Sequence, residues 1–237
     1  MEQTVTVETT GTTMDVYDAV PEGEVRGAVV LFQEAFGVND HIQDVARRFA
    51  AAGYRTVAPH IFHRTGDPTI AYDDMGSVVP HAMALELPNI DADLQACIDY
   101  LGRQGFAPGQ IGMVGFCLGG SITSVEAARQ ALGAAVAFYG GGIAQGRFGA
   151  PGLAESAPDL TTPWLAFFGD QDQGIPVEEV EQLRAAAAGA SVDAEVVRYP
   201  DAEHGFHCDA RSSYHEASAT DAWQRTLQWL DGHLDPA

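Results

Sequence analysis

The chain has 237 residues, 46% of them hydrophobic, and its 33 acidic residues outnumber its 12 basic ones to give a formal net charge of -21. Every basic residue is Arg. Because so acidic a surface repels nucleic acid and anionic membranes, we exclude both as partners. The length fits one α/β domain over residues 1–237, whose core is large enough to fold without a metal or a disulfide.

The cysteines and the N-terminus indicate the compartment. Cys97, Cys117 and Cys208 are odd in number and widely spaced, which is typical of a reducing environment and not of a disulfide framework. The first ten residues resemble no signal peptide, and no run reaches the ~20 apolar residues of a membrane span. We therefore expect a cytoplasmic protein, either a monomer or a small homo-oligomer. The acidic excess also suggests adaptation to a salt-rich cytoplasm.

The first half of the chain predicts a strand pair, a central strand and a capped helix. Apolar and polar residues alternate on both sides of Thr10-Gly11, so residues 1–20 predict a β-hairpin at the sheet edge. The run 27–32, GAVVLF, is apolar on both faces, as in a central parallel strand. Asn39 can cap a helix that runs to about residue 52.

The remaining chain alternates between strands and helices. Residues 60–80 show little periodicity, so we expect an irregular loop there that can serve as a lid. The other predicted strands cover 54–58, 110–114, 134–138, 163–168 and 194–199, and the other predicted helices cover 89–101, 121–130, 177–188 and 212–233. This alternation predicts an α/β protein with a mostly parallel central sheet flanked by helices on both faces.

One turn between a strand and a helix carries a reactive residue type. Cys117 is the centre of a G-x-C-x-G pattern, which is the cysteine form of the nucleophile elbow. At the start of a helix, the dipole and the unpaired N–H groups favour a thiolate and a nearby oxyanion. The alternative is a small buried cysteine in a tight turn.

Polar residues also follow several predicted strands. Because the carboxyl ends of parallel strands meet at one edge of a sheet, these side chains should gather there. The order nucleophile, acid, base along the chain is that of the α/β-hydrolases. The residues are Glu34, Cys117, Tyr139, Asp172 and His204.

From about residue 26 to residue 230 the sequence resembles the dienelactone hydrolase (carboxymethylenebutenolidase) family of the α/β-hydrolase superfamily. The resemblance implies an α/β-hydrolase fold and hydrolysis of a lactone or small ester without a cofactor. The motifs that carry it are QEAFGVN at 33–39, GFCLGG at 115–120, FYG at 138–140, GDQDQGIP at 169–176 and EHGF at 203–206.

The resemblance also implies a role for each site residue. Cys117 would attack the carbonyl carbon, His204 would act as general base, and Asp172 would orient the imidazole. Asp170 competes for the role of the acid, although Asp172 fits the family pattern better. The backbone N–H groups of Leu118 and Ala35 would form the oxyanion hole.

Glu34 is the distinctive residue of this family. In relatives it contacts the resting thiol and helps to activate it only when substrate binds. A carboxylate beside a thiol disfavours the thiolate, which protects it from oxidation. Tyr139 and Phe36 are expected to line the substrate pocket.

Substrate binding departs from the family in one respect. Dienelactone hydrolases hold the substrate carboxylate with arginines, one of them directly after the catalytic His, and no Arg occupies that loop here. His207, Arg64 and Arg211 are the candidates that remain for this role. Otherwise the substrate is an uncharged ester or lactone.

Two other functions compete with hydrolysis. The chain could be a redox or stress-response thiol protein that uses Cys117 with Glu34, or a non-catalytic binding protein on a hydrolase fold. A metal is not expected, because Cys208 and His207 show no ligand spacing with His204.

Overall fold

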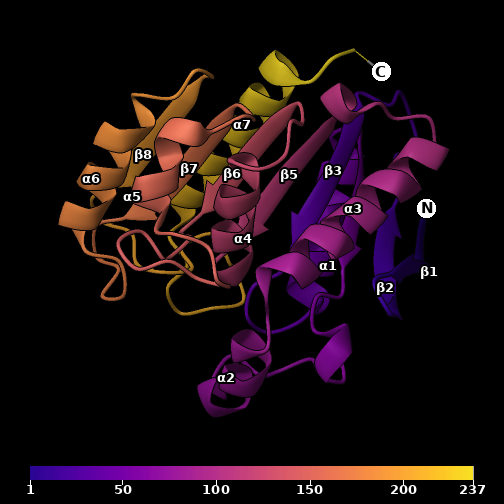
Figure 1. Ribbon diagram of the computed structural model, residues 1–237, viewed down its shortest axis with the longest axis horizontal. Coiled ribbons are helices and arrows are strands. Elements are labelled where there is room, and N and C mark those ends of the chain that lie inside the picture. Colours follow the sequence, from indigo (N-terminus) through magenta and orange to yellow (C-terminus); the bar gives the residue numbers. More distant parts are fainter. Residues whose placement is uncertain (237) are drawn as a thin grey trace.

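The architecture was determined from a computed structural model that describes residues 1–236. Within that range, eight strands form one sheet in the order β1-β2-β4-β3-β5-β6-β7-β8 (Figure 1). β2 runs antiparallel to both of its neighbours, and the pairings from β4 to β8 are all parallel. The strands are β1 (Glu2–Thr9), β2 (Thr12–Ala19), β3 (Gly27–Phe32), β4 (Tyr54–Pro59), β5 (Ile111–Phe116), β6 (Ala134–Phe138), β7 (Trp164–Gly169) and β8 (Ala194–Tyr199).

Helices cover both faces of the sheet, which confirms the predicted fold class. α1 and α7 share one face, where Phe49 and Trp223 pack with their ring centroids 4.5 Å apart, and α3 to α6 lie on the other face (Figure 1). The helices are α1 (Asp40–Ala51), α2 (Met75–Met83), α3 (Leu87–Arg103), α4 (Leu118–Ala127), α5 (Leu153–Ser156), α6 (Val177–Ala187) and α7 (Glu216–His233).

The central strands are buried on both faces because they consist almost entirely of apolar and small residues. β3, β5, β6 and β7 contain only buried residues. The unbroken apolar runs in the sequence therefore became the centre of the sheet, as expected when helices cover both faces. Asn39 caps α1 as predicted, since its side chain accepts a hydrogen bond of 3.1 Å from the backbone N–H of Ile42.

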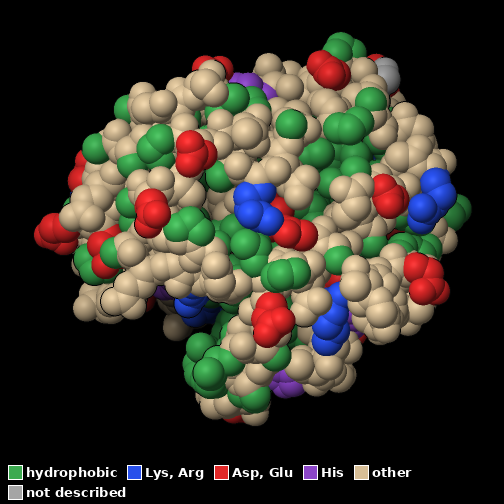
Figure 2. All heavy atoms as spheres, in the orientation of Figure 1, with side chains coloured by type: hydrophobic (Ala, Val, Ile, Leu, Met, Phe, Trp, Pro, Cys, Tyr) green, Lys and Arg blue, Asp and Glu red, His purple; other side chains and the backbone are tan. Residues whose placement is uncertain are grey.

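Residues 60–80 are not uniformly irregular, which corrects the expectation for this segment. Its last third belongs to α2, where the Asp74 side chain caps the helix by accepting a 3.2 Å hydrogen bond from the N–H of Ser77. Gly76 and Pro80 lie inside this helix and are atypical of helices, so the sequence pattern did not predict it. In Figure 1, α2 projects from the lower edge of the molecule, and Figure 2 shows hydrophobic side chains gathered there.

Helix ends also differ from prediction where a cap decides them. α7 begins at Glu216 rather than near residue 212, because the His215 side chain caps it. α4 begins directly after Cys117, which therefore lies at the start of a helix as predicted. Within residues 1–236, no helix has the combination of length and apolar character needed to cross a membrane.

Candidate active site

Cys117 occupies a strained turn between β5 and α4. Its backbone has φ 54° and ψ −110°, which few residues other than Gly adopt. It is the residue before the first helical position of α4, and its side chain is partly exposed, whereas Cys97 and Cys208 are buried. The turn therefore presents this thiol alone, of the three, at the start of a helix.

The glycines around Cys117 are required by close approach of the backbone. A Cβ on Gly115 would overlap the carbonyl group of Gly119, and a Cβ on Gly119 would overlap the carbonyl oxygen of Phe32. A Cβ on Gly120 would likewise overlap the end of β6. The small residues of the motif thus allow α4 to pack directly on β3 and β6, and this packing fixes the position of Cys117.

His204 and Asp172 form a hydrogen-bonded pair at the carboxyl edge of the sheet. Nδ1 of His204 lies 2.6 Å from Oδ2 of Asp172, whose side chain is almost fully buried. Asp170, the competing acid, is instead paired with Arg198 through two contacts of 2.6 and 2.7 Å. The geometry therefore favours Asp172 as the partner of the histidine.

The surroundings of His204 favour its protonated form. Burial by itself lowers the pKa of the imidazole, but interactions with Asp172 and with the Cys117 thiol outweigh it and raise the pKa to about 10. The charge of His204 is therefore set by its two contacts and not by its burial.

Two backbone N–H groups are available to bind an oxyanion. Leu118 is the first residue of α4, where an N–H has no acceptor within the helix. In the described part of the chain, neither the N–H of Leu118 nor that of Ala35 donates to another backbone group outside the regular elements. Both residues follow strand ends that border the Cys117 turn, β5 and β3.

Glu34 is completely buried in the loop between β3 and α1. One carboxylate oxygen lies 3.4 Å from Nη1 of Arg211, and the other has no hydrogen-bond partner among the described residues. Burial raises the pKa of Glu34, against the opposing influence of Arg211 and His204. The hydrogen bonds of Glu34 thus lead to Arg211 and not directly to the Cys117 thiol.

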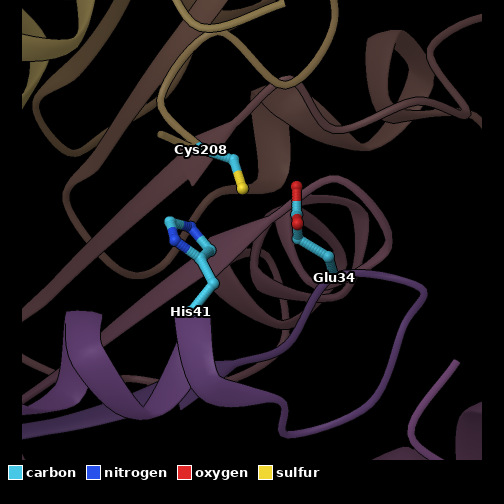
Figure 3. Close-up of side chains that lie close together, drawn as sticks. All are labelled: Glu34, His41 and Cys208. Atoms are coloured by element: carbon cyan, nitrogen blue, oxygen red, sulfur yellow. The ribbon is translucent and has the colours of Figure 1, made fainter. Parts of the chain in front are cut away.

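Glu34, His41 and Cys208 point toward one another from three different segments, as Figure 3 shows. Their potential ligand atoms lie within 4.8 Å of one another. The guanidinium of Arg211 already provides a positive charge beside Glu34, and this charge opposes the binding of a metal cation. We therefore keep the prediction of no metal.

Three predicted substrate-binding residues lie around the triad. The ring centroid of Tyr139 is 5.0 Å from that of His204, and its buried hydroxyl has no partner among the described residues. The guanidinium of Arg211 lies 5.7 Å from the ring centroids of both Phe36 and Tyr72. Tyr72 was not identified from sequence, because it lies in a segment without a recognisable pattern.

The structure places the other two substrate-binding candidates elsewhere. His207 is buried among aromatic rings, 5.0 Å from Phe116 by ring centroids, and burial lowers its pKa to about 3. Arg64 forms a two-pronged ion pair with Asp93 on α3, with contacts of 2.6 and 2.9 Å. Neither residue lines the clefts that border the triad.

Two clefts of different character lie next to the candidate triad, one containing Asp172 and His204 and the other containing Leu118, the neighbour of Cys117. The polar cleft, with a volume of about 800 Å³, is lined by Asp172, His204, Tyr72 and Arg211 together with other polar residues. The apolar cleft, of about 700 Å³, lies under α2 and reaches Leu118, the residue after Cys117. A third cleft, of about 710 Å³, lies between the N-terminal strands and α1 and contains no triad residue.

Apart from Leu118, the apolar cleft is lined by residues that the sequence did not single out. They come from α2, from the segment that leads into α3, and from a loop after β6. Only the tertiary structure brings these segments together. The lining residues are Val78, Val79, Ala82, Met83, Leu85, Glu86, Pro88, Leu118, Arg147, Phe148 and Gly149.

Comparison with known proteins places this geometry in a family. The model of the "Dienelactone hydrolase family" matches residues 14–234. A protein of Salmonella typhimurium, "Putative carboxymethylenebutenolidase", is 39% identical over 226 residues, which cover 93% of this chain and 83% of that one. The "Carboxymethylenebutenolidase" of Pseudomonas putida is 28% identical over 94% of this chain and 96% of its own length.

A solved structure shows the same fold. The crystal structure of "Putative Dienelactone Hydrolase from Klebsiella pneumoniae" superposes with a TM-score of 0.90 and 36% sequence identity, covering 97% of this chain and 98% of that one. More distant neighbours include an esterase of Thermogutta terrifontis, with a TM-score of 0.72 and 18% identity. At that identity the likeness concerns the fold alone.

Proposed function

This chain belongs to the dienelactone hydrolase family of the α/β-hydrolase superfamily and is a hydrolase of lactone or ester bonds, and we propose that it acts through a Cys117–His204–Asp172 triad. The observation that carries the proposal is the 2.6 Å contact between His204 and Asp172, next to a strained cysteine at a helix start. A nucleophile, a base and an orienting acid are what acyl transfer requires.

The proposed reaction has two steps. In the first, the Cys117 thiolate attacks the carbonyl carbon, and the N–H groups of Leu118 and Ala35 stabilise the oxyanion. The C–O bond to the alcohol breaks, the alcohol oxygen takes a proton from His204, and a thioester remains. In the second, His204 takes a proton from water, which attacks the thioester carbon. The C–S bond breaks and the acid product leaves, which restores the Cys117 thiolate beside protonated His204.

Glu34 and Arg211 are proposed to control the nucleophile indirectly. Their contact joins the loop after β3 to the segment after His204. Because Arg211 lowers the pKa of Glu34, a substrate that displaces Arg211 favours the protonated form of Glu34. The proposed substrate is a small-molecule lactone or ester, and the reaction needs no cofactor. Hydrolysis of a thioester needs a positioned base that activates water, a step that a redox thiol does not require, and the His204–Asp172 pair provides such a base, which favours hydrolysis over that alternative.

The triad is tested by hydrolysis of 4-nitrophenyl acetate, a simple lactone and a dienelactone. We expect Cys117→Ala and His204→Ala to lower kcat/KM by roughly 10³-fold or more, because each removes a group that acts directly on the reacting atoms. Cys97→Ala is the matched control, since Cys97 is buried in α3 and should leave turnover unchanged.

The thioester is tested by mass spectrometry after acid quench. Protein mixed with 4-nitrophenyl acetate should gain one acetyl group on the peptide that contains Cys117, and Cys117→Ala protein should not. Turnover that survives both triad substitutions, or acetylation at another residue, would refute the proposed mechanism.

A further inference from the structure

Arg147 differs from nearly every other Arg in its pairing. Within residues 1–236, each Arg except Arg103 and Arg147 has a carboxylate within 4.0 Å. In a chain where acidic residues outnumber basic ones 33 to 12, an Arg without a carboxylate is unusual. Arg103 lies at the end of α3 beside the Tyr100 ring, and Arg147 lies at the apolar cleft.

Hydrogen bonds connect Arg147 to the first turn of α4. Its Nη1 donates to the hydroxyl of Ser121 over 3.2 Å, and that buried hydroxyl also lies 3.4 Å from the carbonyl oxygen of Cys117 and 2.9 Å from that of Gly141. The guanidinium is therefore only two hydrogen bonds away from the backbone of the nucleophile. Most of its N–H groups still have no acceptor among the described residues.

The glycine run after Tyr139 provides room for the Arg147 side chain. A Cβ on Gly142 would lie 3.0 Å from Cγ of Arg147, and one on Gly141 would lie 3.7 Å from its Nη1. A side chain at Gly142 would crowd Arg147, whereas a Cβ at Gly141 would only touch it. The glycines thus explain a sequence feature to which the triad assigns no role.

The loop that carries Arg147 is held in a strained conformation. Phe148 has φ 60°, a value that is costly for an aromatic residue, and its carbonyl oxygen accepts a 2.8 Å hydrogen bond from the N–H of Leu87. Such strain persists only where the surroundings fix it, and it is concentrated at functional sites. The bond to Leu87 ties the Arg147 loop to the start of α3.

We propose that Arg147 binds an anionic group of the substrate at the wall of the apolar cleft. The preferred substrates are then amphiphilic esters or lactones, in which a carboxylate contacts Arg147 while an apolar portion packs against α2. This inference rests on the proposed hydrolase function and deepens it. The site lies on the Leu118 side of the nucleophile, whereas Arg211 lies in the polar cleft on the His204 side.

The lining of the apolar cleft supports an amphiphilic substrate. Val78 is buried, whereas Val79 and Met83 on the same helix are 51% and 80% exposed. Apart from Glu86, Arg147 is the only charged residue among the lining residues of the described cleft. An apolar wall with an exposed guanidinium that has no carboxylate partner matches a ligand with an apolar body and one negative charge.

The test compares two 4-nitrophenyl esters that differ only in charge: the hexanoate ester and the monoester of adipate, whose free carboxylate ends a chain of equal length. We expect Arg147→Gln to lower kcat/KM for the adipate monoester about tenfold, the loss typical of one charge-assisted hydrogen bond at a partly exposed site. The hexanoate should change by less than about twofold. Arg103→Gln, the matched control, should leave both values unchanged.

Two further measurements separate binding of charge from a structural role. Arg147→Lys, which keeps the charge, should recover part of the preference for the adipate monoester. Added KCl should weaken that preference in the wild-type protein, because the guanidinium is exposed to solvent. If Arg147→Gln lowers kcat/KM equally for both esters, the inference is overturned. It is also overturned if Arg103→Gln lowers kcat/KM for the adipate monoester as much as Arg147→Gln does.

Binding measurements without turnover distinguish a failure of the proposed hydrolase function from a failure of the anion-site inference. If the wild-type protein cleaves neither ester, the proposed function fails, and the inference is decided by equilibrium dialysis of the two esters with Cys117→Ala protein. The anion site is supported if Cys117→Ala protein binds the adipate monoester more tightly than the hexanoate ester and the double variant with Arg147→Gln does not. Equal binding of both esters rejects it.

Discussion

The chemistry proposed for Cys117 depends on side chains that are distant in sequence. Asp172 and His204 come from the loops after β7 and β8, and the thiol comes from the turn after β5. Burial acts against a charged imidazole, yet the contacts with Asp172 and Cys117 raise the pKa of His204 to about 10. The charge state of the site is therefore set by partners rather than by solvent exposure.

Asp172→Asn tests this dependence at a single residue. The substitution removes the negative charge that raises the pKa of His204, so the imidazolium should lose its proton at lower pH and stabilise the Cys117 thiolate less. We expect kcat to fall by roughly 10²–10⁴ and the alkylation of Cys117 by iodoacetamide near neutral pH to slow. The pH profile of alkylation should move to higher pH.

Asp170→Asn is the matched control, because it makes the same change two residues earlier. Asp170 is paired with Arg198, so its loss should leave alkylation and most of the turnover intact. A larger loss of activity in Asp170→Asn than in Asp172→Asn would reverse the assignment of the acid.

At the scale of the elements, α4 carries a buried carboxyl group toward α3. Glu126 is completely buried on α4, and one of its oxygens has no partner among the described residues. Burial, together with the carboxylate of Asp91 on α3, raises the pKa of Glu126 to about 8. Arg129 pairs with Asp91 over 2.6 Å, which leaves Glu126 without a cation of its own.

This shift predicts how stability changes with pH. Because the pKa in the folded chain lies above the ordinary value of 4.5, the protonated form of Glu126 is favoured by folding. Its contribution to the free energy of unfolding is complete below pH 4.5 and is lost as the pH rises toward 8. Glu126→Gln should therefore raise Tm at pH 8 and flatten the dependence of Tm on pH.

Glu178→Gln serves as the control for the removal of one negative charge. Glu178 is exposed near the start of α6, where an acidic residue favours the helix dipole, so this substitution should not raise Tm at pH 8. An equal rise of Tm in both variants would attribute the effect to net charge and not to the buried carboxyl group.

At the scale of the whole molecule, the excess of acidic side chains opposes the compact state. Figure 2 shows acidic side chains scattered over the visible face, with fewer basic ones. Most Arg side chains are paired with carboxylates, so many acidic side chains have no Arg partner and repel one another, in keeping with the net charge of -21. Such repulsion between exposed charges extends over about 10 Å at 0.1 M salt and is screened as salt increases.

The stability of the protein should consequently increase with salt concentration. We expect Tm, measured by circular dichroism, to rise from low salt to molar KCl, because screening reduces the repulsion that unfolding relieves. A Tm that does not change across the KCl series would reject adaptation of this surface to salt.

The sequence by itself determined the elements whose signals are local. The apolar runs of β3 and β6 and the Asn39 cap of α1 depend on neighbouring residues only, and the structure has them as predicted. The G-x-C-x-G pattern also defined the Cys117 turn, because steric overlap of backbone atoms permits few other residues there. The family followed from several such motifs in the expected order.

The tertiary structure decided what depends on contacts between distant segments. It paired Glu34 with Arg211, placed His207 in the aromatic core and engaged Arg64 with Asp93, none of which periodicity can predict. It also joined α2 to the loop of Arg147 and so created the apolar cleft. A local pattern fixes backbone conformation and exposure, but the surroundings of a charged side chain come from segments far away in the chain, and these surroundings determine what it binds.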